Sequence, residues 1–190
     1  ENSDNLRIKE KIEKDFNNVN CFLAGQNLGY AKGNNFGLKK VVTKYALILN
    51  PDASLEPMTL ENFLKFADQY PDFSIAGPYK QNDKNKEPNL KISNSMEVKN
   101  IKGFAMFLNL EKFKDIGYFD ENFFIYFEEI DLCTRISNLN RKIYLVPSII
   151  INHEGAQSHD KDINREMELS RNWHWMWSTF YYHRKYKGYF

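Results

Sequence analysis

Apolar and polar residues follow one another along the first part of the chain in a pattern that predicts helices and short strands. Apolar residues recur every fourth position over 6–16 (LRIKEKIEKDF), the spacing of an amphipathic helix, and Ser3 or Asp4 is its predicted cap. The apolar run 19–25 (VNCFLAG) predicts a short buried strand. Residues 26–42 predict a glycine-rich turn followed by a second helix.

The alternation continues in the middle of the chain. Residues 45–49 (YALIL) predict a strand, TLENFLKFADQYP predicts a helix capped by Thr59, and 73–78 (FSIAGP) predict another strand. Residues 79–96 are polar and aperiodic, which predicts a surface loop or flap. A further strand is predicted within 98–110.

The last third of the chain contains the same kinds of element. A short helix is predicted over 111–117, and the stretch 123–135 begins a second helix after a loop at FDEN. The strings KIYLVP and IIINH are predicted strands. Helices and strands that alternate in this way are typical of an α/β fold with a mostly parallel sheet. The length of 190 residues suits one domain, which we place at 1–160, followed by a helical, aromatic and basic tail at 161–190.

Charge and cysteine content narrow the function classes. The net charge of +1 gives no whole-molecule attraction to nucleic acid, so we expect no such partner. Cys21 and Cys133 lie in apolar settings, which favours reduced thiols and a cytoplasmic location, with a disulfide as the alternative. No apolar run is long enough to span a bilayer and no signal peptide is evident. Because the chain opens at Glu1 on the turn-rich string ENSDN, we expect a preceding segment to be missing.

Candidate ligands for a cation follow two predicted strands. In open α/β sheets ligands bind beyond the carboxyl ends of the strands. Asp52 ends a strand on a proline turn, where it either holds a divalent cation or only forms the turn. His153 ends the strand IIIN and is either a nitrogen ligand or a structural histidine. The string HEGAQSH does not have the HExxH spacing of a zinc helix.

The string QNLGYAKGNNFG (26–37) is a candidate for phosphate binding. Its glycines do not have the dinucleotide GxGxxG spacing, which disfavours a nicotinamide-dependent oxidoreductase. It combines a flexible turn, Lys32 and the side-chain amides of Asn27, Asn34 and Asn35 ahead of a helix, all suited to a phosphorylated ligand. An ordinary loop-to-helix connection remains the alternative.

The string FFIYFEEIDLCTR (123–135) places three acids behind a row of large apolar residues. On a helix Glu128 and Asp131 share a face, whereas Glu129 points toward the side of Cys133. Acids near the start of a helix are also favoured by its dipole, so a purely structural role is the alternative to a catalytic one.

Taken in order, these strings resemble family 2 glycosyltransferases of the inverting GT-A type, especially the rhamnosyltransferase-like branch. The strings are NLGYAKGNN, NPD, KGFAMFLN, GYFDENFFIYFEEIDLCTR and NHEGAQS, and the resemblance covers most of the chain. It implies a GT-A fold, a mixed and mostly parallel sheet flanked by helices. The resemblance also implies a βα unit ahead of ENS, so we expect this first unit of the fold to be missing from the sequence.

The resemblance implies roles for individual residues. Glu129 falls at the general-base position, with Glu128 and Asp131 beside it, and Asp52 and His153 fall at metal positions for Mg²⁺ or Mn²⁺. The implied donor-binding residues are Glu1, Ser3, Asn27, Gly29, Tyr30, Lys32, Asn34 and Asn50. Glu129 departs from the commoner aspartate of the family.

The mechanism implied is a single displacement on a nucleotide-sugar donor. The metal would neutralise the diphosphate, and Glu129 would deprotonate a hydroxyl of a glycan or lipid-linked acceptor during cell-surface polysaccharide synthesis. The aromatic run 123–127 would form a dry acceptor pocket that raises the pKa of the base, while Asp131 or Glu128 orients it or pairs with Arg135. A non-catalytic fragment that binds nucleotide or sugar is the alternative.

The tail RNWHWMWSTFYYHRKYKGYF (171–190) is aromatic and basic and contains no acid. Such a composition suits a lipid surface with anionic head groups, which would place the protein at the inner face of the cytoplasmic membrane. Packing on its own domain, or on a second subunit of a homo-oligomer, is the alternative.

Overall fold

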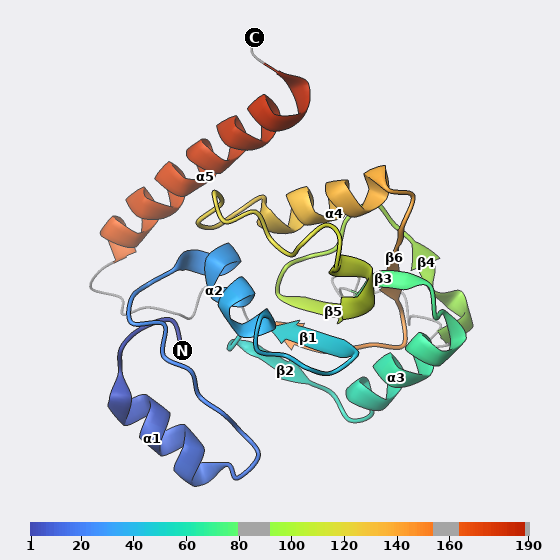
Figure 1. Ribbon diagram of the computed structural model, residues 1–190, viewed down its shortest axis with the longest axis horizontal. Helices are drawn as coiled ribbons and strands as arrows, with labels where there is room; N and C mark the ends of the chain where they lie inside the picture. The colour runs from blue at the N-terminus through green and yellow to red at the C-terminus, as the bar shows by residue number, and fades with distance from the viewer. Residues whose placement is uncertain (80–91, 154–163, 189–190) are drawn as a thin grey trace. The chain divides into compact units, whose positions relative to one another are not determined.

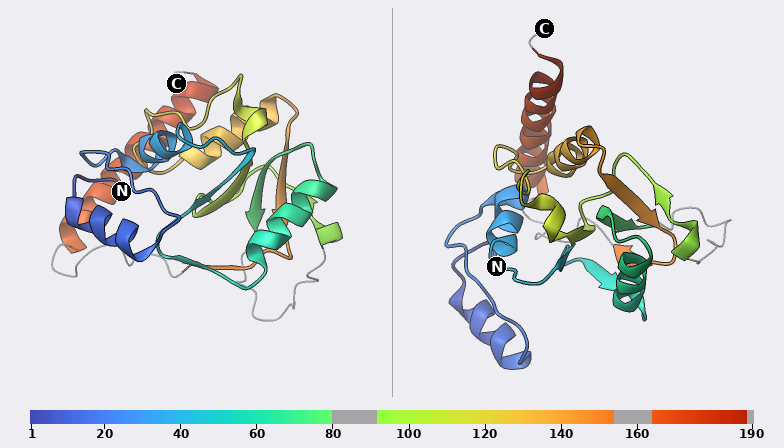
Figure 2. Two further views of the ribbon diagram at one scale, coloured as in Figure 1. Left: turned by 60° about the horizontal axis from the view of Figure 1, so that its bottom comes forward. Right: turned by 45° about the vertical axis from the view of Figure 1, so that its right-hand side comes forward.

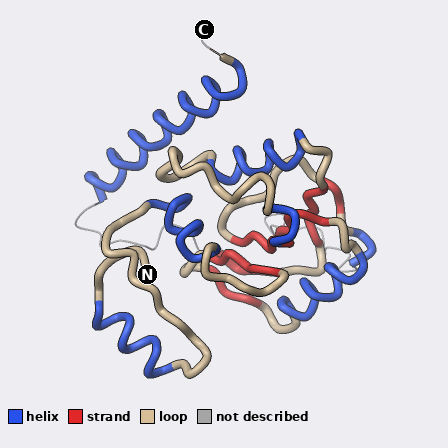
Figure 3. The backbone as a smooth tube through the Cα atoms, in the orientation of Figure 1, coloured by secondary structure: helices blue, strands red, loops and turns tan. Residues whose placement is uncertain are grey.

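The structure is a computed structural model that describes residues 1–79, 92–153 and 164–188. The chain forms two compact units. The helical unit comprises Glu1–Val42, Tyr118–Glu128 and Asn172–Phe190, and the sheet unit comprises Thr43–Gly117 and Glu129–Arg171. All described strands belong to the sheet unit (Figure 3). The division into a domain at 1–160 and a tail at 161–190 stays a prediction.

A five-stranded sheet in the order β1-β5-β3-β6-β4 forms the centre of the sheet unit (Figure 1). Its strands are β1 (Tyr45–Leu49), β3 (Phe73–Pro78), β4 (Met96–Glu97), β5 (Ala105–Asn109) and β6 (Lys142–Val146). Within the described residues β3 and β6 pair in parallel, whereas β1 with β5, β5 with β3 and β4 with β6 pair antiparallel.

The prediction of a mostly parallel sheet is therefore wrong in its strand pairing. β1, β3 and β6 run in one direction, as helix–strand alternation requires. However, β5 lies between β1 and β3 in the opposite direction and converts one expected parallel contact into two antiparallel ones.

Helix α3 (Thr59–Gln69) supplies one side of the main core. Its Phe63, Phe66 and Ala67 are buried against residues of β3, β5 and β6, with Phe63 packed on Phe107 at a centroid distance of 4.6 Å. Figures 1 and 2 show α3 on one face of the sheet and α4 (Glu128–Asn138) on the other. The sheet thus has an apolar layer on each face, as an α/β fold requires.

Thr59 does not cap α3, contrary to the prediction. The preceding residue, Met58, occupies the cap position with a positive φ of 69°, and the Thr59 hydroxyl donates to the carbonyl of Ile150 at 3.0 Å. A tertiary hydrogen bond therefore uses the side chain that local sequence assigned to capping.

Several predicted elements are shorter in the structure. The loop predicted at 79–96 lies mostly outside the described residues, and its described end contains η1 (Ile92–Asn94) and β4. The helix predicted over 111–117 is the 3₁₀ turn η2 (Leu110–Phe113). The strand IIINH is reduced to β7 (Ile151–His153), which pairs antiparallel with β2 (Ala53–Leu55) in a second, two-stranded sheet.

The helical unit contains α1 (Leu6–Asp15), α2 (Gly29–Leu38) and most of α5 (Asn164–Lys187). Asn5, rather than Ser3 or Asp4, caps α1 by accepting from the amide of Ile8 at 3.2 Å. Residues 19–25 do not form the predicted strand. Their amides are bonded to the chain start and to the Glu13 carboxylate, which supply isolated acceptors instead of a continuous neighbouring strand.

Both cysteines are buried free thiols, as predicted, and burial raises the pKa of the Cys133 thiol to about 12. In the part of the chain that the structure describes, no helix combines the length and apolar content needed to cross a membrane.

Candidate active site

The pairing of β2 with β7 brings Asp52 and His153 together. Ala53 is the register partner of His153, so the preceding Asp52 lies beside the histidine ring. His153 Nε2 is 3.1 Å from Asp52 Oδ1, and both side chains remain partly exposed. The two residues are about a hundred positions apart in sequence, and the strand ends place their carboxylate and imidazole at one point.

Phe104 connects this pair to a cavity in the sheet unit. Its ring stacks on the His153 imidazole, with centroids 4.6 Å apart and an interplanar angle of 9°, and its carbonyl accepts from the Asn50 amide at 2.8 Å. The same phenylalanine lines a cavity of about 370 Å³. The lining residues are Pro78, Asn100, Ile101, Lys102, Phe104, Glu129, Ile130 and Leu145. Phe104 thus connects the Asp52–His153 pair and the Asn50 amide to the cavity that Glu129 lines.

Glu129 presents its carboxylate to this mainly apolar cavity. Its Oε2 atom is buried and has no hydrogen-bond partner among the described residues. Burial raises the pKa of Glu129 above its usual value, although the backbone amides of Glu129 and Ile130 and the charge of Lys102 act in the opposite direction. A carboxylate with a raised pKa and an open acceptor position can take a proton from a bound hydroxyl.

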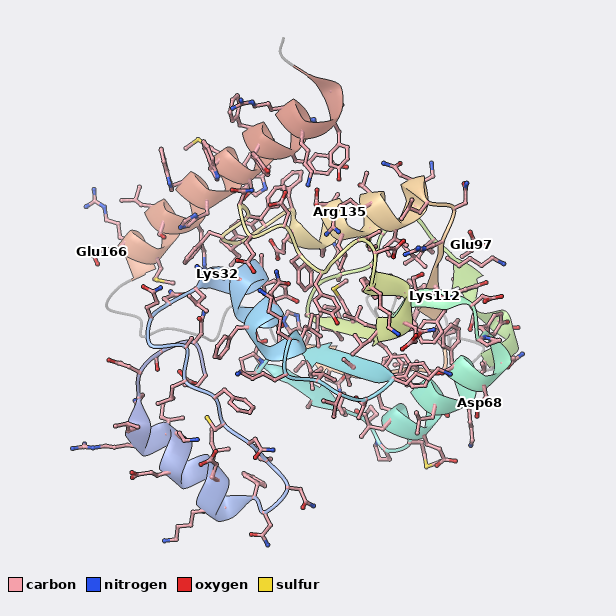
Figure 4. The ribbon with its side chains drawn as sticks, in the orientation of Figure 1. Lys32, Asp68, Glu97, Lys112, Arg135 and Glu166 are labelled. Carbon is pink, nitrogen blue, oxygen red and sulfur yellow. The ribbon has the colours of Figure 1, made fainter. Side chains whose placement is uncertain are left out.

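The other two acids of the run have different surroundings. Asp131 is fully buried and accepts from Arg135 Nε at 2.9 Å, as predicted, and the Arg135 guanidinium also donates to the carbonyl of Ile116 at 3.0 Å. Figure 4 shows Arg135 on α4. Glu128 is buried at the first position of α4. Asp131 thus anchors α4 through its ion pair, and Glu129 is the acid of the run that lines this cavity.

The aromatic residues ahead of these acids belong to the helical unit, and their role in an acceptor pocket stays a prediction. Within the helical unit Phe123, Phe124 and Phe127 pack on Tyr181, His174 and Tyr182 of α5. The apolar lining of the cavity comes from aliphatic residues and Phe104, contributed by several segments of the sheet unit. We did not predict roles for Lys102 or Phe104, although the string KGFAMFLN contains both, because their positions become informative only once β5 is placed.

The predicted donor-binding residues, apart from Asn50, belong to the helical unit. Asn2 clamps the turn before α2, since its amide oxygen accepts from the Leu28 amide at 2.8 Å and its nitrogen donates to Asn27 Oδ1 at 3.0 Å. Asn27 Oδ1 also accepts from the Gly29 amide at 3.0 Å. The Asn27 side chain is thus part of the turn itself, and Asn2 is a turn residue that the sequence reasoning missed.

Gly29 has a structural reason to be glycine. Its φ is +72°, and a Cβ atom at this position would lie 2.3 Å from the carbonyl oxygen of Phe124, to which Tyr30 donates its amide. The neighbouring polar side chains of α2 differ in their surroundings. Asn34 donates to its own helix at the Tyr30 carbonyl, at 2.9 Å, whereas Lys32 is exposed on α2 (Figure 4).

Asn35 is buried, and its side chain is bonded to residues of the helical unit. Its side chain donates to the Phe119 carbonyl at 2.9 Å and to Glu121 at 3.0 Å, and accepts from the Phe119 amide at 3.0 Å. At the chain start the Ser3 hydroxyl donates to the Glu1 carboxylate at 2.8 Å, and Glu1 borders a cavity of about 230 Å³.

Comparison with known proteins shows which family has this arrangement. The sequence model of glycosyl transferase family 2 matches residues 2–135. The chain belongs to glycosyl transferase family 2. It is 26% identical over 167 residues to the low-salt glycan biosynthesis hexosyltransferase of Haloferax volcanii, a match that covers 75% of this chain and 53% of that protein. The chain therefore spans about half the length of this curated relative.

Solved structures show that the family 2 chain has the GT-A glycosyltransferase fold. GalNAc-T7, crystallised with UDP, GalNAc and Mn²⁺, superposes with a TM-score of 0.65 at 13% identity, over 84% of this chain and 37% of that one. S. aureus TarS gives a TM-score of 0.55 at 20% identity, over 75% and 27%. A TarS fragment in complex with UDP-GlcNAc gives 0.54 at 17% identity, over 86% and 52%.

Proposed function

We propose that this family 2 chain is an inverting glycosyltransferase that moves a hexosyl residue from a nucleotide-sugar donor to a hydroxyl of a glycan or lipid-linked acceptor. The observation that carries the proposal is Glu129, whose buried Oε2 atom lacks a partner among the described residues and lines a cavity. The same cavity is bordered by Phe104, which stacks on the imidazole of the Asp52–His153 pair.

The proposed chemistry is a single displacement. The acceptor hydroxyl attacks the anomeric carbon, the bond to the diphosphate oxygen breaks, and Glu129 takes the proton released by the hydroxyl. The raised pKa of Glu129 improves the carboxylate as a base, and the apolar lining excludes water that would compete with the acceptor. Asp131 and Arg135 act indirectly, by fixing the helix that carries Glu129.

The Asp52–His153 pair suits a divalent cation. It offers one carboxylate and one imidazole, and Mg²⁺ or Mn²⁺ is commonly held by one or two protein groups together with substrate phosphates. No group of three or more potential ligands occurs among the described residues, so the diphosphate oxygens would complete the coordination. When bound, the cation would neutralise charge on the leaving diphosphate.

The relatives suggest the donor and pathway class. GalNAc-T7 was crystallised with UDP and the TarS fragment with UDP-GlcNAc, so we propose a uridine diphosphate sugar as the first donor to test. The Haloferax relative is a hexosyltransferase of glycan biosynthesis, which supports a hexose and a role in cell-surface polysaccharide synthesis. A rhamnosyl donor of the related branch is the next candidate.

The test is sugar transfer by Glu129→Gln. Loss of the base should lower turnover by on the order of 10² to 10⁴ while leaving donor affinity largely unchanged. Turnover is followed by release of nucleoside diphosphate in the presence of Mn²⁺ and acceptor, and donor affinity by thermal shift. Glu61→Gln is the matched control, because Glu61 forms an exposed ion pair with Lys65 on α3.

Full transfer by Glu129→Gln would remove Glu129 from the mechanism. A wild-type chain that binds nucleotide but transfers no sugar would instead support the non-catalytic, nucleotide-binding alternative.

A further inference from the structure

Helix α5 presents two different faces within the helical unit. One face consists of residues spaced by four, three and four positions, which places their side chains on the same side of a helix: His174, Ser178, Tyr181 and Lys185. A second face consists of residues that lie three or four positions from one another along the helix: Trp173, Met176, Trp177 and Phe180. We call the second set the tryptophan stripe.

The first face is bound to segment 118–128 by contacts from each of its four residues. His174 stacks on Phe124 at 4.4 Å, and the Ser178 hydroxyl donates to the Ile125 carbonyl at 2.8 Å. Tyr181 packs on Phe123 and donates to Asp120, and Lys185 donates to the same carboxylate at 2.7 Å. The contacting residues of the segment are Asp120, Asn122, Phe123, Phe124 and Ile125. This face explains how the helix is held in its unit.

The tryptophan stripe has no comparable cover from the described residues. Trp173, Met176, Trp177 and Phe180 are 63%, 56%, 43% and 55% exposed. Four large apolar side chains exposed side by side on one face are unusual for a surface in water, and such patches mark binding sites for proteins or membranes.

The charges on the helix favour one occupant. Arg184 and Lys187 continue the spacing of the tryptophan stripe toward the end of α5. The sequence after Ser170 also contains Arg171 and Lys185, and it contains no acid. The two acids of α5, Glu166 and Glu168, belong to its first turns; Figure 4 shows Glu166 at this end. Tryptophan is enriched at membrane–water interfaces, and basic residues beside it attract anionic head groups.

We propose that the tryptophan stripe is a docking surface for an anionic phospholipid bilayer. The rings of Trp173, Trp177 and Phe180 enter the interfacial layer, and Arg184 and Lys187 contact head-group phosphates. The helix lies in the plane of the interface while its other face stays bound to segment 118–128. This surface does not depend on the catalytic assignment, so its test and the test of Glu129 fail independently.

The three tryptophans of the chain provide the measurement, because all three lie in α5. Trp175 is 53% exposed but belongs to neither face, so it is a matched internal control. Vesicles of phosphatidylcholine with phosphatidylglycerol, carrying bromine-labelled acyl chains, quench tryptophans that enter the bilayer. Trp175→Phe keeps the two stripe tryptophans and should be quenched strongly, whereas Trp173→Phe/Trp177→Phe keeps only Trp175 and should be quenched weakly.

Flotation with the same vesicles measures partitioning. Trp173→Gln or Trp177→Gln should lower the partition coefficient roughly tenfold, because each variant leaves about 60 Å² less apolar surface to bury in the bilayer. Arg184→Gln or Lys187→Gln should each lower it about fivefold, and only when phosphatidylglycerol is present. Trp175→Gln should change it little.

Two results would overturn the proposal. Equal quenching of the stripe tryptophans and Trp175 would show that the stripe does not face the bilayer. A wild-type chain that stays in solution with vesicles but forms a dimer, which Trp173→Gln converts to a monomer in light scattering, would assign the stripe to a second copy. Circular dichroism of each variant checks that α5 remains helical.

Discussion

Glu129 differs from its acidic neighbours in what surrounds its carboxylate. The sequence placed Glu129 on a different face from Glu128 and Asp131 through helix geometry alone, and the structure agrees, since Asp131 pairs with Arg135 while Glu129 lines the cavity. The identity of the cavity wall could not be predicted in this way. It depends on side chains from several distant segments, and only the sheet brings these together.

A carboxylate with a buried oxygen atom that lacks a hydrogen-bond partner should reduce stability. Because burial raises the pKa of Glu129, the folded state binds the proton of this carboxyl group more tightly than the unfolded state does. The contribution of Glu129 to the free energy of unfolding is therefore complete below the unfolded pKa and is lost as pH rises through the folded pKa. Glu129→Gln should therefore have a higher Tm than wild type at neutral pH. The difference should shrink toward pH values below the usual glutamate pKa, as measured by calorimetry across pH.

The matched control for this prediction is again Glu61→Gln, which should shift Tm little and without this pH trend. A Tm difference for Glu129→Gln that stays constant across pH would contradict the assignment of a raised pKa to Glu129.

At the scale of elements, α2 shows how local sequence and tertiary contact combine. The glycine-rich turn was predicted from composition, but the reason for Gly29 is the carbonyl of Phe124, a residue far away in sequence. Sequence offered no signal for Tyr126 and Phe127, which have positive φ values of 71° and 66° immediately before α4. Aromatic residues rarely adopt this conformation, so only surrounding contacts can impose it.

Two glycines of α2 should respond oppositely to alanine. Gly29→Ala should destabilise the protein by more than about 1 kcal/mol, because φ is positive and the new Cβ would meet the Phe124 carbonyl. Gly37→Ala should stabilise it by about 0.5–1 kcal/mol, because Gly37 is helical with nothing within 4 Å of an added Cβ. Urea unfolding of both variants measures the two changes, and destabilisation by Gly37→Ala would contradict this account of α2.

At the scale of the whole molecule, each compact unit is assembled from separate stretches of chain. In the helical unit Asp120 joins two of them, since its carboxylate accepts from Lys185 at 2.7 Å and from Tyr181 at 3.1 Å. Burial alone would raise the pKa of Asp120, but the hydrogen bonds from Lys185 and Asn122 outweigh it and hold this pKa below its usual value.

Asp120 should therefore stabilise the protein mainly above the usual aspartate pKa. Its contribution is present above the unfolded pKa and is lost as pH falls through the lowered folded pKa. Asp120→Asn should cost about 1–3 kcal/mol at neutral pH, since Lys185 and Tyr181 lose a charged acceptor, and the cost should diminish in acid. Urea unfolding from acidic to neutral pH checks this. Asp115→Asn is the variant for comparison, because Asp115 and its partner Arg141 form an ion pair within the sheet unit rather than the helical unit.

Short-range periodicity predicted the positions of most helices and strands and the separation of Glu129 from Asp131. The alternation of helices and strands predicted the common direction of β1, β3 and β6. The folded chain alone shows that β5 lies between β1 and β3, and that Asp52 contacts His153. Strand order and the meeting of distant side chains are set by which apolar faces can be buried together, and no local window of sequence contains that information.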